Sequence, residues 1–357
     1  MPIGSSVRHA AAALLVFGIA SGLTARTEIA AAAQPQLAVA ADGQVWLVYG
    51  HGSEIFVARS TDDGATFTPA VRAVTAPKLM LGMRRGPRIA ATGARVTVTY
   101  VTDELRAVHS KDGGRTWSDP VVVNDVPGCA REGLHDLALG PDGRCFVTWL
   151  DHRNAGMELW FAESTDSGAT WSRNAQIYQS SDRTICECCH PTALFDAAGN
   201  LAVMWRNAIA GDRDMWIATR PAGASKFSPA RKSGEGSWQL AACPMDGGRL
   251  IALGNGDFAG IWQRAGTVFY APPRGPEKPL GPGKQPVALV QADGTRIVWQ
   301  QGTDLVTAKL PSAAQPTKVA PEARFPVLAA LPANRGAVLA YEQGATKDPH
   351  LVIERLP

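Results

Sequence analysis

Short apolar runs separated by turns repeat along most of this chain. In each unit an apolar run, an Asp-Gly or Gly-Asn turn and a second run ending in an aromatic residue come first, and a third run follows. Typical second runs are Val45–Tyr49, Cys145–Trp149 and Leu201–Trp205. Short runs bounded by Gly, Asn and Asp are typical of strands joined by hairpins. The pattern therefore predicts strands throughout and no long helices.

Three of these units end in the same kind of segment. Its pattern is Ser-x-Asp-x-Gly-x-Thr-aromatic, with spacings of 50 and 54 residues, at Ser60–Phe67, Ser110–Trp117 and Ser164–Trp171. A degenerate copy contains Gly223, Ser225 and Phe227. Asp accepts hydrogen bonds from turn amides, and Gly tolerates positive φ. The segment therefore predicts a hairpin turn between the third and fourth strands of a unit.

Four strands in 40 to 55 residues are typical of a propeller blade. Seven starts of inner strands can be placed, at Gln36, Pro87, His135, His190, Leu240, Pro286 and Pro326. We therefore expect an all-β propeller of four-stranded antiparallel blades in one domain, residues 34–357. Seven blades are expected, with six as the alternative. The last unit lacks a fourth strand, which the segment before Gln36 could donate to close the ring.

The repeated segments resemble the Asp-box (bacterial neuraminidase) repeats of the sialidase superfamily, over most of residues 36–357. This resemblance implies a propeller, and many propellers without sialidase activity carry such repeats. For a sialidase it implies three arginines that bind a carboxylate, a Tyr–Glu nucleophile pair and an acidic residue. Arg88, in Gly86–Ala90, is similar to the start of the family's Arg-Ile-Pro motif, with Ala in place of Pro. Asp103 lies where the acid/base is expected.

Other parts of the sialidase pattern match less well. Tyr341 and Glu342 are adjacent in a strand and should point to opposite faces, which makes them a poor nucleophile pair. Several arginines could complete the carboxylate site: Arg131, Arg153, Arg206, Arg213 and Arg324. A sialidase or another glycoside hydrolase is therefore the alternative interpretation, and whether the protein is an enzyme stays open.

Residues 1–33 are typical of a secretory signal. Arg8 precedes the apolar stretch Ala10–Ala20, and small residues follow up to Ala33. The stretch is too short to cross a bilayer, which needs about 20 residues. We expect cleavage near Ala33, with a cut after Ala25 as the alternative, and a periplasmic or secreted protein. Export would permit disulfides between the six cysteines.

Composition narrows the possible partners. The chain is 45% hydrophobic, which suffices for a core, and its net charge is only +3 without a long basic run. Nucleic acid is therefore not expected as a partner. No segment after the signal is apolar enough to span a membrane. A small molecule, a glycan or a metal ion is therefore the expected partner. The sequence gives no indication of oligomeric state.

The loops of a propeller are divided between two faces. The loops that lead from one blade into the next (lead-in loops) and those joining second to third strands lie opposite the Asp-box turns. In this chain they contain most of the reactive side chains. The residues expected to bind a ligand are Arg131, Glu132, Asp136, Asp151, Arg153 and Arg206.

Cys186-Glu187-Cys188-Cys189-His190 is the most unusual segment on this face, and four interpretations stay open. The cysteines could form structural disulfides, in which case no cofactor is expected. They could bind a soft metal, Cu(I) first and Zn(II) next. The expected ligands for that metal are Cys129, His135, Cys186, Cys188, Cys189 and His190.

The third interpretation is covalent haem, since Cys186, Cys189 and His190 match Cys-x-x-Cys-His. The motif occurs once, and a lead-in loop has little room for a porphyrin, so haem is disfavoured. The fourth is a reactive thiol or a vicinal Cys188–Cys189 disulfide. Cys145 and Cys243 are expected near the Asp-box end, with structural roles. The sequence thus predicts an exported, sialidase-like propeller that binds a ligand or soft metal at a Cys/His/Arg-rich face.

Overall fold

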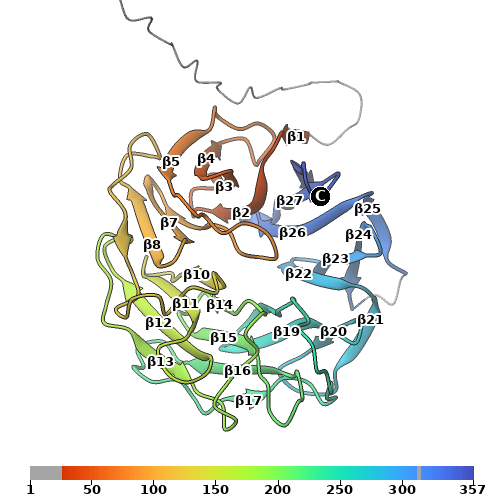
Figure 1. Cartoon of the computed structure of the whole chain (residues 1–357). Helices are drawn as coiled ribbons and strands as arrows, with labels where there is room; N and C mark the ends of the chain where they lie inside the picture. Colours follow the sequence, from red (N-terminus) through yellow and green to blue (C-terminus); the bar gives the residue numbers. More distant parts are fainter. Residues whose placement is uncertain (1–25, 312–314) are drawn as a thin grey trace, which may run out of the picture.

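The computed structural model describes residues 26–311 and 315–357. These residues form seven four-stranded antiparallel sheets arranged around a central axis (Figure 1). The only helical element among them is a short 3₁₀ turn, Pro332–Asn334, and none of their helices could span a membrane. The all-β propeller is therefore confirmed, with seven blades and not six.

Each of the first three blades is formed by four consecutive strands, ordered from the axis outwards. Blade 1 contains β2 (Ala33–Val39), β3 (Val45–His51), β4 (Glu54–Ser60) and β5 (Val71–Thr75). Blade 2 contains β6 (Arg88–Thr92), β7 (Arg95–Val101), β8 (Leu105–Ser110) and β9 (Val121–Val122). Blade 3 contains β10 (His135–Leu139), β11 (Cys145–Asp151), β12 (Glu158–Ser164) and β13 (Ala175–Tyr178).

Blades 4 to 6 follow the same order. Blade 4 contains β14 (Thr192–Phe195), β15 (Leu201–Arg206), β16 (Met215–Arg220) and β17 (Arg231–Lys232). Blade 5 contains β18 (Arg249–Gly254), β19 (Asp257–Arg264), β20 (Thr267–Ala271) and β21 (Lys278–Pro282). Blade 6 contains β22 (Lys284–Gln291), β23 (Gly294–Gln301), β24 (Asp304–Leu310) and β25 (Thr317–Ala320). Blade 7 consists of β26 (Ala323–Ala330), β27 (Ala337–Gln343), β28 (His350–Leu356) and β1 (Arg26–Ile29).

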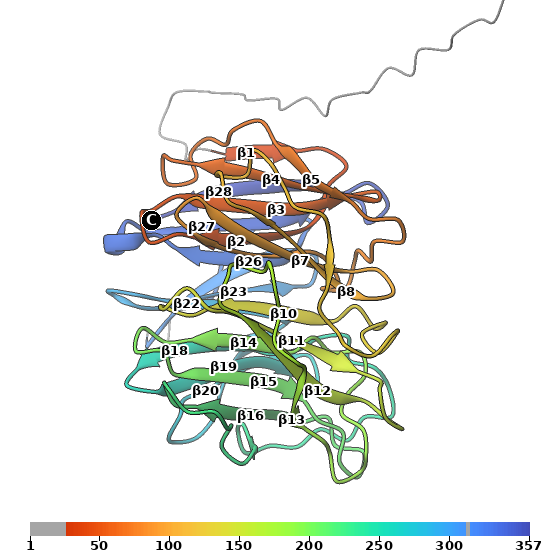
Figure 2. The same ribbon diagram turned by 90° about the vertical axis from the view of Figure 1, so that its left-hand side faces the viewer.

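The N-terminal strand closes the ring, as expected. β1 pairs with β28, with Arg26 opposite Glu354 and Ile29 opposite Leu351, and Figure 2 shows it beside the last blade. The domain boundary expected at residue 33 stays a prediction, and the pairing places residues 26–29 in the last blade. A cut after Ala25 would leave β1 whole. The rest of the expected signal, residues 1–25, lies outside the described residues.

Six of the seven predicted inner-strand starts fall within three residues of the observed ones. Leu240 is the exception, because β18 begins at Arg249. Residues 240–248 form a lead-in loop instead, and the Leu240 N–H donates to Gly211 O at 3.2 Å. The apolar run Leu240–Cys243 resembles a strand locally, but its backbone has no neighbouring strand with which to pair.

Every second strand ends in a buried aromatic residue at an equivalent position. The seven are at most 3% exposed: Tyr49, Tyr100, Trp149, Trp205, Trp262, Trp299 and Tyr341. Burying a large apolar side chain stabilises a fold by roughly 1.5–3 kcal/mol. This repeated position therefore anchors each blade within the core.

The three repeated segments form identical turns between third and fourth strands. In blade 3 the Asp166 carboxylate accepts the Thr170 N–H at 2.9 Å and the Thr170 hydroxyl at 2.6 Å. Asp62 and Asp112 do the same with Thr66 and Thr116. These turns define one face of the propeller, and the lead-in loops lie on the opposite face.

Candidate functional site

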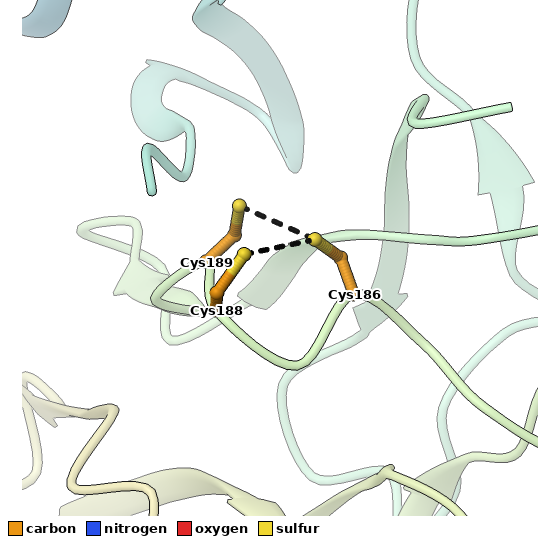
Figure 3. Close-up of side chains that lie close together, drawn as sticks. All are labelled: Cys186, Cys188 and Cys189. Carbon is orange, nitrogen blue, oxygen red and sulfur yellow. Dashed lines mark hydrogen bonds between the residues drawn. The ribbon is translucent and has the colours of Figure 1, made fainter. Parts of the chain in front are cut away.

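The lead-in loop of blade 4, between β13 and β14, gathers three thiols. The Cys186 Sγ lies 3.7 Å from the Cys188 Sγ and 3.4 Å from the Cys189 Sγ (Figure 3). All three atoms lie within 4.8 Å of one another, and their residues are 2%, 7% and 1% exposed. Within residues 26–311 and 315–357, no other group of three or more His, Cys, Asp or Glu side chains brings its ligand atoms this close together.

The three thiols differ in how readily they ionise. Hydrogen bonding with Cys188 and Cys189, assisted by the positive charge of Arg206, lowers the pKa of Cys186. Burial and the Cys186 thiol raise the pKa of Cys189. The arrangement therefore favours one thiolate held by two neighbouring thiols, and the thiolate is the form that binds metals.

Arg206, at the end of β15, positions this loop. Its carbonyl oxygen accepts the Cys186 N–H at 3.0 Å. Its guanidinium donates to the carbonyl oxygens of Asp246 (3.1 Å) and Gln263 (2.9 Å), and the residue is 1% exposed. These contacts occupy the N–H groups that were expected to bind a ligand. Arg206 instead joins the lead-in loops of blades 4 and 5.

Cys243 lies beside the thiol cluster, so the prediction of a place at the Asp-box end is wrong. It sits in the lead-in loop of blade 5 and is exposed, and its side-chain interaction with Cys188 raises its pKa to about 11. The error follows from the misplaced start of β18. Cys145 does lie at the Asp-box end as expected, with its Sγ 3.6 Å from Thr97 Oγ1.

The other expected metal ligands are not in the three-thiol group. The Cys129 Sγ lies 3.8 Å from Arg153 Nη2, and burial together with the Asp151 carboxylate raises its pKa to about 12. His135 Nε2 lies 3.1 Å from Thr99 Oγ1. His190 accepts the Gly247 N–H at 3.3 Å through Nδ1. All six cysteines carry free thiols here, so the expected disulfides stay a prediction.

A second polar centre lies in the central channel. Residues of all seven inner strands line a cavity of about 200 Å³. In it, Arg88 Nε lies 3.4 Å from Asp136 Oδ1, and Arg249 Nη1 lies 3.8 Å from Asp136 Oδ2. Arg84, in the lead-in loop of blade 2, donates from its guanidinium to Pro326 O at 3.0 Å. Two guanidinium groups therefore line the channel with the Asp136 carboxylate, and the charge of Arg84 acts on both of them.

Burial and the neighbouring charges act on these arginines together. Burial and the charge of Arg249 lower the pKa of Arg84 to about 9, and burial lowers the pKa of Arg88 to about 10 although Asp136 opposes it. The Nε atoms of Arg84 and Arg249 are buried without a hydrogen-bond partner. The Asp246 carboxyl also interacts with Arg84, so three guanidinium groups face two acidic side chains, Asp136 and Asp246. The remaining positive charge and the free donors suit a small anion.

Sequence reasoning did not select Arg84 or Arg249. Arg84 sits in the lead-in loop of blade 2, where the local pattern is that of a solvated Arg-Arg pair. Arg249 opens an inner strand, as Arg88 and His135 do. That shared position at the start of an inner strand could have identified Arg249 as a channel residue. Because the start of β18 was predicted at Leu240, Arg249 was not recognised as such.

The residues expected for hydrolysis are not brought together. Arg88 contacts Asp136 in the channel, whereas Asp103 is exposed on the hairpin between β7 and β8. A hydrogen bond from Thr102 lowers the pKa of Asp103, while a general acid needs a raised one. Tyr341 and Glu342 face opposite ways as expected, toward Arg26 and Arg324 respectively.

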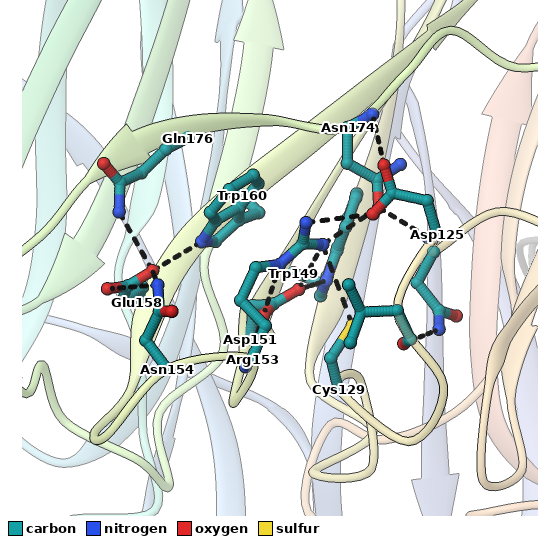
Figure 4. A network of polar contacts seen from close by, with 12 residues as sticks. Asp125, Cys129, Trp149, Asp151, Arg153, Asn154, Glu158, Trp160, Asn174 and Gln176 are labelled. Carbon is teal, nitrogen blue, oxygen red and sulfur yellow. Dashed lines mark hydrogen bonds and ion pairs between the residues drawn. The ribbon is translucent and has the colours of Figure 1, made fainter.

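The remaining expected ligand-binding residues, apart from Arg131, pair with neighbouring side chains of the propeller. Arg153 donates to Asp151 and Asp125 at 2.9 Å and lies 3.6 Å from the centre of the Trp160 ring (Figure 4). Asp151 also accepts the Trp149 Nε1–H at 2.7 Å. Glu132 lies 3.1 Å from His152 Nε2, and Arg131 is exposed. The Asp151–Arg153 pair thus holds a blade 3 loop in place.

Comparison with solved structures identifies the class of fold. An α-L-arabinanase from Penicillium chrysogenum shares 12% identity, with 91% of this chain and 93% of that chain covered and a TM-score of 0.54. The intramolecular trans-sialidase from Ruminococcus gnavus shares 12% identity, covering 91% and 94%, with a TM-score of 0.52. YCF48 from Cyanidioschyzon merolae shares 13%, covering 92% and 98%, with a TM-score of 0.55.

At these identities the likeness shows the fold, a sialidase-like seven-bladed propeller, and not a shared activity. No protein-family profile matches the chain, and no curated protein matches it. Function is therefore argued from the sites themselves.

Proposed function

We propose that this protein binds one Cu(I) ion through Cys186, Cys188 and Cys189. The observation that carries the proposal is the compact group of three buried sulfur atoms on one lead-in loop. Thiolates are soft ligands and favour Cu(I) over harder cations. Structural Zn(II) sites need four ligands. The buried group supplies three, and the neighbouring fourth thiol, Cys243, is exposed.

The surroundings support a single bound cation. Arg206 holds the loop in place through the Cys186 N–H, so the sulfur atoms are positioned in advance. Burial excludes water, which protects Cu(I) from competing ligands and oxidants. The expected ligands Cys129, His135 and His190 have partners elsewhere and are left out of this proposal.

Competition with a colorimetric Cu(I) chelator tests the proposal. Under reducing conditions the protein should withdraw one equivalent of Cu(I), and Cys186→Ser and Cys189→Ser should abolish this. Cys145→Ser is the matched control, since Cys145 is also buried but lies at the opposite face. Equal binding by all four proteins would refute the three-thiol site.

We also propose that the protein is exported and that its signal ends near Ala25. This end leaves β1 intact, whereas an end at Ala33 removes it. N-terminal sequencing of protein recovered outside the cytoplasm should find Arg26 as the first residue. A mature chain that begins at Gln34 would contradict the proposal.

A second candidate function is the binding of an anionic small molecule or glycan in the central channel. The unpartnered Nε atoms of Arg84 and Arg249 favour it. Calorimetric titration with carboxylated sugars should give binding that Arg249→Ala removes and Arg131→Ala leaves unchanged. Turnover of a sialoside that depends on Arg88 and Asp103 would instead support the glycoside hydrolase alternative.

A further inference from the structure

The lead-in loop of blade 5, residues 240–248, lies against the thiol cluster. Met245 packs on the three buried cysteines. The Gly247 N–H donates to His190 Nδ1, and a Cβ at position 247 would lie 2.2 Å from the His190 carbonyl oxygen. Arg206 links the two loops through the Asp246 carbonyl. These contacts are independent of one another, and together they hold the loop close over the site.

This loop places a fourth thiol at the surface. Cys186 and Cys189 are the most buried, Cys188 is slightly less so, and Cys243 is exposed next to Cys188. The four thiols therefore form a path from the interior to solvent. A chelator or donor protein cannot reach the sulfur atoms of Cys186 and Cys189 directly, because the chain covers them.

We infer that Cys243 is the thiol through which Cu(I) enters and leaves the buried site, an inference that rests on the proposed Cu(I) binding. Three thiolates complete the coordination of Cu(I), so an exposed fourth thiol is free to exchange. Met245 offers a thioether on the same loop, which is another soft ligand. The loop thus supplies the exchange side of the site.

The transfer is a ligand exchange without redox chemistry. The Cys243 Sγ forms a bond to Cu(I) as one sulfur or nitrogen of the donor leaves, and the thiol proton passes to the departing ligand or to water. Cys188 then binds and passes its proton to Cys243 as the bond to Cys243 breaks. Cys186 and Cys189 bind as the remaining donor ligands leave, and any proton that they carry passes to those ligands or to water. Copper stays Cu(I) throughout, and the reverse order releases it.

Stopped-flow transfer between the full protein and bathocuproine disulfonate tests this role. We expect Cys243→Ser to slow uptake and release by roughly tenfold each, with an equilibrium affinity within about a factor of three of wild type. A residue that contacts copper only during the exchange changes the barrier between the two end states and not the end states themselves. Cys145→Ser should match wild type in both. A second measurement uses the wild-type protein alkylated at its exposed thiol while loaded, which should be equally slow.

The outcomes separate the inference from the proposed function. Wild-type rates in Cys243→Ser and in the alkylated protein would overturn the exchange role while leaving Cu(I) binding intact. An affinity that falls as far as the rate would make Cys243 a resident ligand and would also overturn it. Failure of the wild-type protein to take up Cu(I) would overturn both.

Discussion

The backbone N–H of Cys186 donates to the carbonyl oxygen of Arg206 at 3.0 Å, and the guanidinium of the same arginine donates to the carbonyl of Asp246. One residue thus holds the two loops that carry the four neighbouring thiols. Arg206 is 1% exposed and its charge is satisfied by backbone carbonyl oxygens. The geometry of the thiol site therefore depends on Arg206, which acts through the backbone of the two loops.

Replacing Arg206 should loosen the site and the fold together. Arg206→Met keeps most of the side-chain volume but leaves buried carbonyl oxygens of Asp246, Gln263 and Arg213 unpaired. We expect a loss of about 3 kcal/mol in the free energy of unfolding, since a hydrogen bond to a charged group contributes about 1.5–3 kcal/mol. Urea titration measures this loss. Arg131→Met, at an exposed position, should change little, and equal effects of the two variants would contradict the assignment.

The turn carboxylates should make stability depend on pH at the acidic end. Burial opposes ionisation of Asp166, but hydrogen bonds from Thr170 and Ser164 outweigh it and lower its pKa to about 2 from an ordinary 3.8. A carboxyl with a lowered folded-state pKa stabilises the fold above its unfolded pKa and loses this as pH falls through the folded one. The contribution is therefore complete above pH about 4 and fades toward about 2.

Asp166→Asn tests this dependence. The variant should be less stable than wild type at neutral pH, and the difference should shrink between pH about 4 and about 2. Thermal unfolding followed by circular dichroism at several pH values measures it. Asp119→Asn, at an exposed position outside the repeated turns, serves as the control. A difference that stays constant down to pH 2 would show that the carboxylate charge contributes nothing.

The closing strand β1 should contribute measurably to stability. Ile29 is 6% exposed and packs in the core shared by blades 1 and 7, so Ile29→Ala should cost about 2–5 kcal/mol. Glu28→Ala alters the same strand at an exposed position and should cost far less. A protein beginning at Gln34 lacks the strand altogether and should unfold at a lower temperature than one beginning at Arg26. Identical melting temperatures would refute the role of β1.

Much of the fold could be read from local patterns. The Asp62, Asp112 and Asp166 turns, the aromatic residue that ends each second strand and the alternating runs all depend on residues close in the chain. The turns recur three times and the strand pattern seven times, and this repetition made the architecture predictable, including the donation of an N-terminal strand to the last blade. The local Cys186–Cys189 segment was recognised for the same reason.

Local patterns did not show which residues belong to each site or which groups they bind. Cys243 was expected near the Asp-box end but lies beside Cys188, on the lead-in loop of the next blade. Cys129 was expected beside the Cys186–Cys189 segment but contacts Arg153 and Asp151. Arg206 was expected to bind a ligand and instead binds backbone carbonyls 40 residues or more along the chain. Spacing in the sequence specifies which face a loop occupies only where the strand starts are placed correctly, which failed for the loop that contains Cys243. Packing between loops of different blades specifies which buried donor meets which acceptor, and therefore which side chains remain available to a metal or an anion.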